Sequence, residues 1–231
     1  MRGPPVSDSF DPIWETDVYG QGRHFNRYPM DVVVSFVAHN RPDGLEPGDV
    51  TVLEVGSGAG NNVWYAAREG YRVRAIEAST TAVDFTRSRL ADEGLEAEVV
   101  VGDFTSLPWD DETVHLAIDR GALTCVGKTA ALAALGELRR VLVPGGRLLF
   151  NPYSSTHTSA EQSRPGPDGT RVEISAGTLQ GVGHLAFWDE AEVRDAAAAG
   201  GWTLRQLAHF SQRDADGGDE HSEWRAVLER A

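Results

Sequence analysis

Residues 51–62, TVLEVGSGAGNN, decide the fold of this chain. An apolar run ends at Val55, and glycines follow at Gly56, Gly58 and Gly60. This order predicts a buried strand, a tight glycine turn and a helix whose first backbone N–H groups face the end of the strand. Glycine suits such a turn because it adopts unusual backbone angles and lets a ligand approach the bare backbone. The stretch therefore predicts a site for a nucleotide-like cofactor.

The spacing of the glycines and a nearby carboxylate bear on which cofactor binds. Dinucleotide-binding turns read G-x-G-x-x-G, whereas this turn reads G-x-G-x-G and carries Glu54 two positions before its first glycine. A carboxylate at that place would repel a pyrophosphate, but it would suit the ammonium and sulfonium of S-adenosylmethionine (SAM). Residues 52–62 resemble the first motif of the class I SAM-dependent methyltransferases, E/D-x-G-x-G-x-G.

Length and composition exclude several classes of protein. A chain of 231 residues holds one sizeable α/β domain with an elaboration. The 21 basic and 35 acidic residues give a net charge of −14, which argues against a nucleic-acid partner. The sequence has no apolar run long enough to span a membrane and no signal-peptide pattern, so it predicts no membrane partner. Cys125 is its one cysteine, which fits a reducing compartment, and we expect a cytoplasmic protein. The oligomeric state stays open, a homodimer being one option.

Alternating strand and helix patterns predict an α/β fold, a Rossmann-like doubly wound sheet that is mostly parallel. The predicted strands cover residues 51–55, 71–76, 97–101, 114–118 and 147–150, the last entered through a turn at Pro144-Gly145-Gly146. Residues 202–210 and 222–228 form two further predicted strands, and the resemblance implies that they make a C-terminal antiparallel hairpin.

The chain divides into a cap and a cofactor domain. Residues 1–48 are predicted to be an N-terminal helical cap or lid, and residues 49–231 the SAM-binding domain with a substrate-side insertion at 152–185. Within the cap, residues 13–28 are rich in aromatics but have no apolar face, and a helix follows Pro29. Two interpretations stay open for residues 13–28: a lid over the cofactor cleft, or an ordinary packed extension.

Three later motifs extend the resemblance over about residues 50–150. Glu77 follows the glycine turn by about 20 residues, where a carboxylate accepts ribose hydroxyls, although NAD would suit it equally. Gly102-Asp103-Phe104 resembles the family's adenine-binding motif, and Asp119-Arg120-Gly121 resembles its fourth motif, near the methionine end of the cofactor. The cofactor-binding residues expected from the turn and these motifs are Glu54, Gly56, Ser57, Gly58, Gly60, Asn61, Asn62, Glu77, Ala78, Ser79, Gly102, Asp103, Phe104, Asp119, Arg120 and Gly121.

The resemblance implies a methyltransferase that moves a methyl group from SAM to an oxygen or nitrogen of a small molecule, for example in specialised metabolism, releasing S-adenosylhomocysteine. His157, which follows the fifth strand, is the candidate catalytic residue, and the sequence has no metal-ligand spacing. The candidate substrate-binding residues are Tyr19, Phe25, Arg27, Tyr28 and Tyr153. The alternatives are an NAD-dependent oxidoreductase of similar fold and a SAM-binding regulator without turnover.

Overall fold

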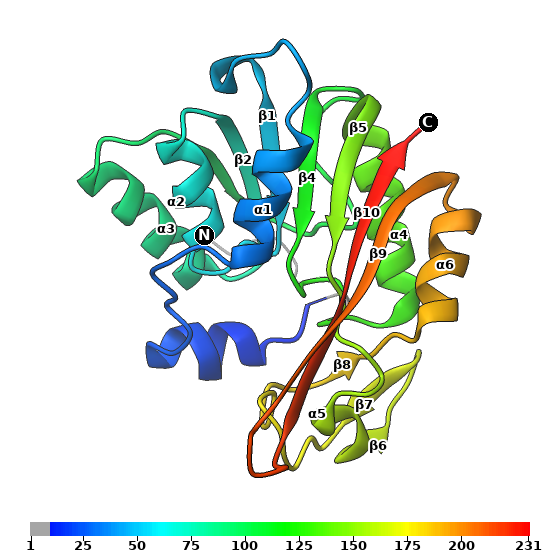
Figure 1. Ribbon diagram of the computed structural model, residues 1–231. Helices are drawn as coiled ribbons and strands as arrows, with labels where there is room; N and C mark the ends of the chain where they lie inside the picture. The colour runs from blue at the N-terminus through cyan, green and yellow to red at the C-terminus, as the bar shows by residue number, and fades with distance from the viewer. Residues whose placement is uncertain (1–9) are drawn as a thin grey trace.

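The computed structural model, which describes residues 10–231, has one large sheet between two layers of helices (Figure 1). Seven strands follow the order β3-β2-β1-β4-β5-β10-β9. The first five are parallel, whereas β10 runs antiparallel to both β5 and β9. The predicted Rossmann-like sheet and its C-terminal antiparallel hairpin are confirmed.

The elements have the following bounds. The strands of the large sheet are β1 (Thr51–Val55), β2 (Arg72–Glu77), β3 (Glu98–Val101), β4 (Val114–Asp119), β5 (Leu142–Phe150), β9 (Trp202–Arg213) and β10 (Glu220–Arg230). The helices are α1 (Asp31–Asn40), α2 (Asn61–Arg68), α3 (Thr80–Asp92), α4 (Lys128–Val141), α5 (Thr158–Glu161) and α6 (Glu190–Ala199). Short helical turns are η1 (Trp14–Val18), η2 (Tyr19–Gln21) and η3 (Pro47–Asp49).

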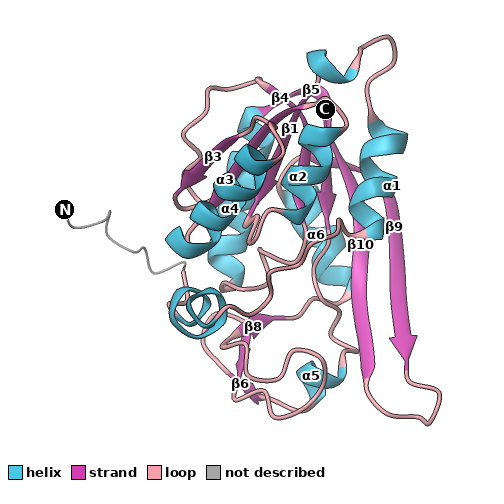
Figure 2. Ribbon diagram, turned by 90° about the vertical axis from the view of Figure 1, so that its left-hand side faces the viewer, coloured by secondary structure: helices cyan, strands magenta, loops and turns pink. Residues whose placement is uncertain are grey.

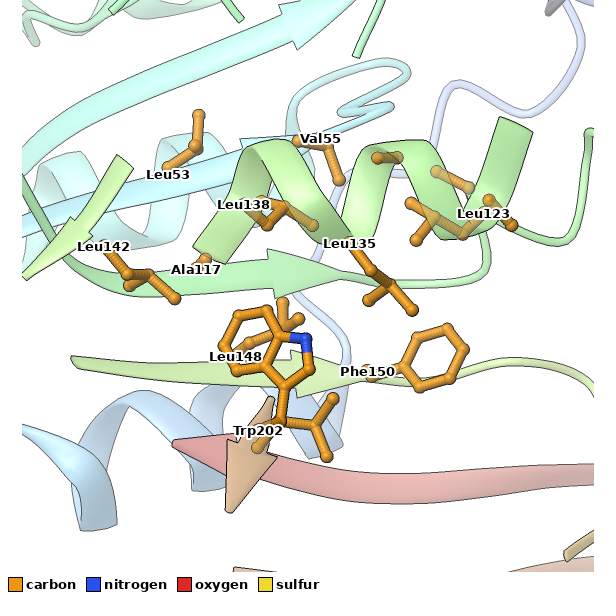
Figure 3. Close-up of a cluster of buried hydrophobic side chains, with 14 of the residues drawn as sticks. Leu53, Val55, Ala117, Leu123, Leu135, Leu138, Leu142, Leu148, Phe150 and Trp202 are labelled. Carbon is orange, nitrogen blue, oxygen red and sulfur yellow. The ribbon is translucent and has the colours of Figure 1, made fainter. Parts of the chain in front are cut away.

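Alternate residues of the central strand β1 enter two separate cores. Leu53 and Val55 pack in the cluster that contains α4 and α6, part of which Figure 3 shows. Val52 packs in the cluster that contains α1, α2 and α3. Because both faces of the strand are covered, its residues are apolar almost without interruption. Thr51 and Glu54 are the exceptions, and Glu54 is a charged type of residue with 3% of its surface exposed.

One local expectation needs correction. Strand β5 begins at Leu142 rather than Arg147, and the Pro144-Gly145-Gly146 segment bulges within the strand, where its pairing register with β4 shifts. Ser79 caps α3 by accepting a hydrogen bond from the amide of Ala82. Asp189 and Glu192 form a capping box at the start of α6.

Two segments gather at the carboxyl end of the parallel strands. The N-terminal turns η1 and η2 lie below these strand ends, beside the insertion, in Figure 1. The insertion forms α5 and a small antiparallel sheet of β6 (Arg164–Pro165), β7 (Thr170–Val172) and β8 (Leu185–Ala186). Figure 2 shows that β9 and β10 extend past the large sheet along this insertion.

Over residues 10–231, none of the helices is both long enough and apolar enough to cross a membrane.

Candidate cofactor and acceptor site

The glycine turn adopts backbone angles that favour glycine. Gly56, Gly58 and Gly60 have φ values of 60°, 51° and 68°. A Cβ atom on Gly58 would lie 2.5 Å from the hydroxyl oxygen of Tyr19, and one on Gly60 would lie 2.3 Å from Cγ2 of Thr86. The turn therefore needs glycine both for its conformation and for its close contacts.

Glu77, at the end of β2, supports this turn. Its Oε2 accepts a hydrogen bond from the amide of Gly58 and its Oε1 accepts one from the amide of Ser79, both at 2.9 Å. Burial raises the pKa of the carboxyl group, although these amides oppose the effect. Each carboxylate oxygen can accept a second hydrogen bond, so Glu77 retains acceptors for a pair of hydroxyl groups.

Glu54 presents a buried oxygen without a protein partner. Its Oε1 accepts a hydrogen bond from Asn62 at 2.7 Å, whereas Oε2 has no hydrogen-bond partner within residues 10–231. Burial raises the pKa of Glu54 to about 8. A cationic group beside Oε2 would offset the cost of burying this charge, which is the environment expected for the ammonium or sulfonium of SAM.

Asp119, at the end of β4, is fully buried and holds the following loop. Its Oδ1 accepts a hydrogen bond from the amide of Leu123 at 2.9 Å. Its Oδ2 has no hydrogen-bond partner in the part of the chain that the structure describes, and burial raises its pKa to about 6. Asp119 thus shapes the loop that carries Arg120.

Two cavities, each of about 150 Å³, are lined in part by Gly56. We call them the Glu77 cavity and the Glu54 cavity after one residue that lines each. The Glu77 cavity is lined by Phe10, Asp11, Trp14, Tyr19, Gly56, Glu77, Ala78, Phe104, Arg120, Gly121, Ala122, Cys125, Val126, Tyr153, Leu179, Val182 and Leu185. The Glu54 cavity is lined by Trp14, Tyr19, His24, Asn26, Met30, Glu54, Gly56, Ser57, Gly58, Ala59, Asn61, Asn62, Arg120 and Tyr153.

Five residues line both cavities and mark where the two meet: Trp14, Tyr19, Gly56, Arg120 and Tyr153. One cavity has the carboxylate Glu77 and the aromatic Phe104, and the other has the buried carboxylate Glu54. A ligand with an adenosine at one end and a cationic amino acid at the other fits this pair of environments, so the residues present suit SAM.

An ion-pair cluster around the buried Glu223 reaches the two cavities through Arg120. Arg120 Nη2 lies 3.1 Å from Oε2 of Glu223 on β10, and Arg225 Nε lies 2.8 Å from the other oxygen of that carboxylate. Burial would raise the pKa of Glu223, but hydrogen bonding to His221 and the charges of Arg120 and Arg225 lower it to about 2. Glu223 therefore stays ionised. It was not found from the sequence.

His157 lies within hydrogen-bonding distance of a second histidine. Its Nδ1 accepts a hydrogen bond from the amide of Ser159, and its Nε2 lies 3.2 Å from Nδ1 of His221. The ring packs edge-on against Tyr153, with a centroid separation of 5.8 Å. Burial and the neighbouring His221 lower the pKa of His157 to about 4. His157 is not among the described residues that line either cavity, and its catalytic role stays a prediction.

The N-terminal turns are docked on α3. Ser79 Oγ and Thr81 Oγ1 donate hydrogen bonds to the carboxylate of Glu15. Tyr19 is 9% exposed and packs with Ala59 and Ala82. Residues 14–21 therefore cover the glycine turn, which is compatible with both a lid and a packed extension.

The predicted residues fall into two groups. Eleven of the expected cofactor residues line the two cavities, together with the substrate candidates Tyr19 and Tyr153: Glu54, Gly56, Ser57, Gly58, Asn61, Asn62, Glu77, Ala78, Phe104, Arg120 and Gly121. Asp103 lines a separate groove beside α4. The residues that neither lining includes are Gly60, Ser79, Gly102, Asp119, Phe25, Arg27 and Tyr28. Phe25 stacks on Phe85 at 4.3 Å, and Tyr28 is 74% exposed.

Residues 52–146 match a family described as "Methyltransferase domain". The cypemycin N-terminal methyltransferase of a Streptomyces species is 30% identical over 147 residues, which span 63% of this chain and 56% of that protein. A tRNA N(3)-cytidine methyltransferase of Gallus gallus is 28% identical over 52% of this chain and 38% of its own length. The chain thus spans about half or less of these two relatives.

The solved structures extend the likeness to the fold. A SAM-dependent methyltransferase of Methanosarcina mazei has a TM-score of 0.70 at 17% identity, covering 88% of this chain and 98% of its own. A structure described as the conversion of a disulfide bond into a thioacetal group in echinomycin biosynthesis has a TM-score of 0.69 at 20% identity, covering 95% and 91%. At these identities the likeness concerns the fold alone.

Proposed function

Because residues 52–146 match a methyltransferase family and the fold is that of a SAM-dependent methyltransferase, we propose that this chain is a class I SAM-dependent methyltransferase and moves a methyl group from SAM to an oxygen or nitrogen atom of a small molecule. The observation that carries the proposal is the pair of cavities that meet at Gly56. In this proposal the cofactor spans both cavities, and the acceptor enters where they meet.

The proposed cofactor contacts follow from the polar groups on the two sides. The free acceptor positions of Glu77 bind the ribose hydroxyls, and Phe104 lies against the adenine. The unpartnered Oε2 of Glu54 faces the ammonium. The backbone N–H groups at the start of α2 are suited to the carboxylate of the cofactor, because a helix N-terminus favours negative charge.

The protein contributes mainly position and exclusion of water to the reaction. SAM supplies a methyl group on a cationic sulfur, which is already activated for displacement. Holding two reactants in line is worth roughly 7–11 kcal/mol of the barrier. Trp14 and Tyr19 cover the junction and would exclude water from it, while Tyr153 forms its opposite side in this proposal.

A small acceptor is favoured over a nucleic acid, although the methyltransferase from Gallus gallus is named for tRNA. Arg120 is the one arginine or lysine among the described residues that line the two cavities. Phosphate backbones require clusters of such side chains, and the whole chain carries a net charge of −14. The small cavity volumes also favour a compact acceptor or the reactive end of a larger molecule.

A screen of small acceptors, following S-adenosylhomocysteine release by mass spectrometry, tests the proposal. A panel of phenols, carboxylic acids and amines should contain at least one acceptor that is methylated, and Glu77→Ala should reduce the rate. Bulk tRNA in the same assay is the comparison. Methylation of tRNA with none of the small acceptors would refute the small-molecule assignment, and absence of SAM binding would refute the proposal altogether.

A further inference from the structure

The junction of the two cavities carries an inference that deepens the proposed function and rests on it. Three of the five junction residues have ionisable side chains: Tyr19, Arg120 and Tyr153. Burial raises the pKa of both tyrosine hydroxyls, so both are protonated at neutral pH. Arg120 is charged throughout the accessible pH range. The junction therefore offers one permanent cation and two phenol groups, but no general base of its own.

Arg120 retains donors that its protein contacts do not use. Its side chain is 15% exposed and its Nη2 is paired with Glu223 at 3.1 Å. Its Nε has no hydrogen-bond partner within residues 10–231. A buried donor without a partner is costly unless a ligand satisfies it. Because a guanidinium matches a carboxylate or phenolate oxygen well, the unmet donor points to an oxyanion.

Glu223 fixes the position of this guanidinium. It lies on β10, where Tyr153 forms a β-bridge with it, and Arg225 occupies its second oxygen. Its pKa of about 2 keeps it ionised at any physiological pH. Glu223 acts through Arg120 and is thus a positioning residue.

Two of the three carboxylates among the described residues that line the cavities already have protein partners. Asp11 accepts a hydrogen bond from the amide of Ile13 and lies 3.1 Å from Nδ1 of His184. Glu77 accepts hydrogen bonds from two backbone amides. Glu54 keeps one oxygen without a partner, but it lines only the Glu54 cavity, and the proposed function assigns that oxygen to the ammonium of the cofactor. An acceptor that must lose a proton would find no free base among the five junction residues.

We propose that the methyl acceptor is an organic oxyanion, a carboxylate or an acidic phenolate with an apolar body, and that Arg120 binds it while Glu223 holds Arg120 in place. The acceptor's lone pair forms the bond to the methyl carbon, while the methyl–sulfur bond breaks and its electron pair stays on sulfur. No proton has to leave, because the acceptor arrives already ionised. Leu179, Val182 and Leu185 of the insertion supply the apolar wall.

Calorimetric titration of the protein saturated with S-adenosylhomocysteine tests this without turnover. The probes are two matched pairs at pH 8: benzoate against benzamide, and 4-nitrophenolate against 4-nitroanisole. The anion of at least one pair should bind about tenfold more tightly than its neutral partner, the effect of a charge-assisted hydrogen bond. Arg120→Met should abolish this preference, Arg120→Lys should keep part of it, and Glu223→Gln should reduce it.

Arg225→Met is the matched control. It removes a guanidinium from the other oxygen of Glu223, and Arg225 is not among the described residues that line either cavity, so the preference should persist. Binding of S-adenosylhomocysteine to each variant, with its melting temperature, is measured first. A wild-type protein that does not bind S-adenosylhomocysteine contradicts the proposed function itself.

Three results would overturn only the inference. They are equal binding of the anionic and neutral probes, absence of binding by both anions, and an anion preference that survives Arg120→Met. A loss of S-adenosylhomocysteine affinity of tenfold or more in Arg120→Met, without any anion preference in the wild type, would instead assign Arg120 to the carboxylate of the cofactor.

Discussion

The two sides of the site are assembled from the chain in different ways. The proposed cofactor side consists of strand ends and the turns that follow them: the glycine turn after β1, Glu77 at the end of β2 and Phe104 after β3. The acceptor side joins the N-terminal turns, the loop after β4, Tyr153 and the insertion, with Glu223 of β10 behind them. The cofactor side is thus encoded in short motifs, whereas the acceptor side exists only in the folded chain.

This difference predicts where substitutions act. A change on the cofactor side should alter SAM and S-adenosylhomocysteine binding alike. A change on the acceptor side should leave both affinities nearly unchanged and alter acceptor binding.

The largest effect is expected at the glycine turn. Gly58→Val places a side chain at φ 51° and within 2.5 Å of the Tyr19 hydroxyl, so it should abolish calorimetrically detectable SAM binding while the protein still folds. Gly94→Val is the matched control, because Gly94 also has a positive φ, of 65°, but a Cβ there would have no neighbour within 4 Å among the described residues. SAM affinity within twofold of wild type in Gly58→Val would contradict the assignment.

A smaller loss is expected at Glu77. Removing an acceptor of two ribose hydroxyls should cost about 1.5–3 kcal/mol, which is roughly a 10- to 150-fold loss of affinity. Glu77→Ala should weaken SAM and S-adenosylhomocysteine equally, because both carry the same ribose. Since Glu77 also binds the amides of Gly58 and Ser79, Glu77→Gln serves as the control that preserves shape. An effect on only one of the two ligands would mean that Glu77 does not bind the ribose.

A several-fold effect of pH is expected through Glu54. With a pKa of about 8, Glu54 is mostly protonated at pH 6, whereas a cationic ligand prefers the carboxylate. Binding of SAM should therefore release a proton and tighten as the pH rises from 6 to 7.5, by at most about tenfold per pH unit. Asp119, with a pKa of about 6, also titrates at the lower end of this pH range. The change of SAM affinity with pH is therefore measured in both the wild type and Glu54→Gln. An equal pH dependence of SAM affinity in the two proteins would show that Glu54 does not face the cationic part of the cofactor.

The smallest effect is expected in the N-terminal segment. If residues 13–28 act as a lid, S-adenosylhomocysteine should slow hydrogen exchange at the backbone amides of η1 and η2 by several-fold. Helix α1 provides the internal control, since its amides should not respond. Glu15 already accepts a hydrogen bond from Thr81 on α3. Slow exchange of the η1 and η2 amides that the ligand does not change would therefore identify a permanently packed extension.

The sheet and the residues that line the proposed cofactor side could be predicted from the sequence because local patterns determine them. The apolar run of β1, the three glycines and the acidic residue about 20 positions later each have a meaning within one strand–helix–strand unit. The capping box of Asp189 and Glu192 is local in the same sense. The start of strand β5 was not predicted correctly, because Gly145 and Gly146 form a bulge within the strand and do not precede it.

The acceptor side could not be read in this way because its contacts join distant residues. Glu223 pairs with Arg120 across 103 positions of sequence, and nothing in the sequence around it distinguishes it from an exposed strand residue. His157 was selected for its place after β5, but the structure buries it against His221 and Tyr153. Arg27 was chosen by charge alone, and its side chain is exposed.

Titration of the wild-type protein with SAM, adenosine and NAD tests the central claim most directly. If the Glu77 and Glu54 cavities hold the two ends of one SAM molecule, SAM should bind at one site per chain and more tightly than adenosine, which reaches only the Glu77 cavity. NAD should give no saturable binding, because Glu54 disfavours its pyrophosphate. Absence of saturable SAM binding, or tighter binding of NAD than of SAM, would contradict the account.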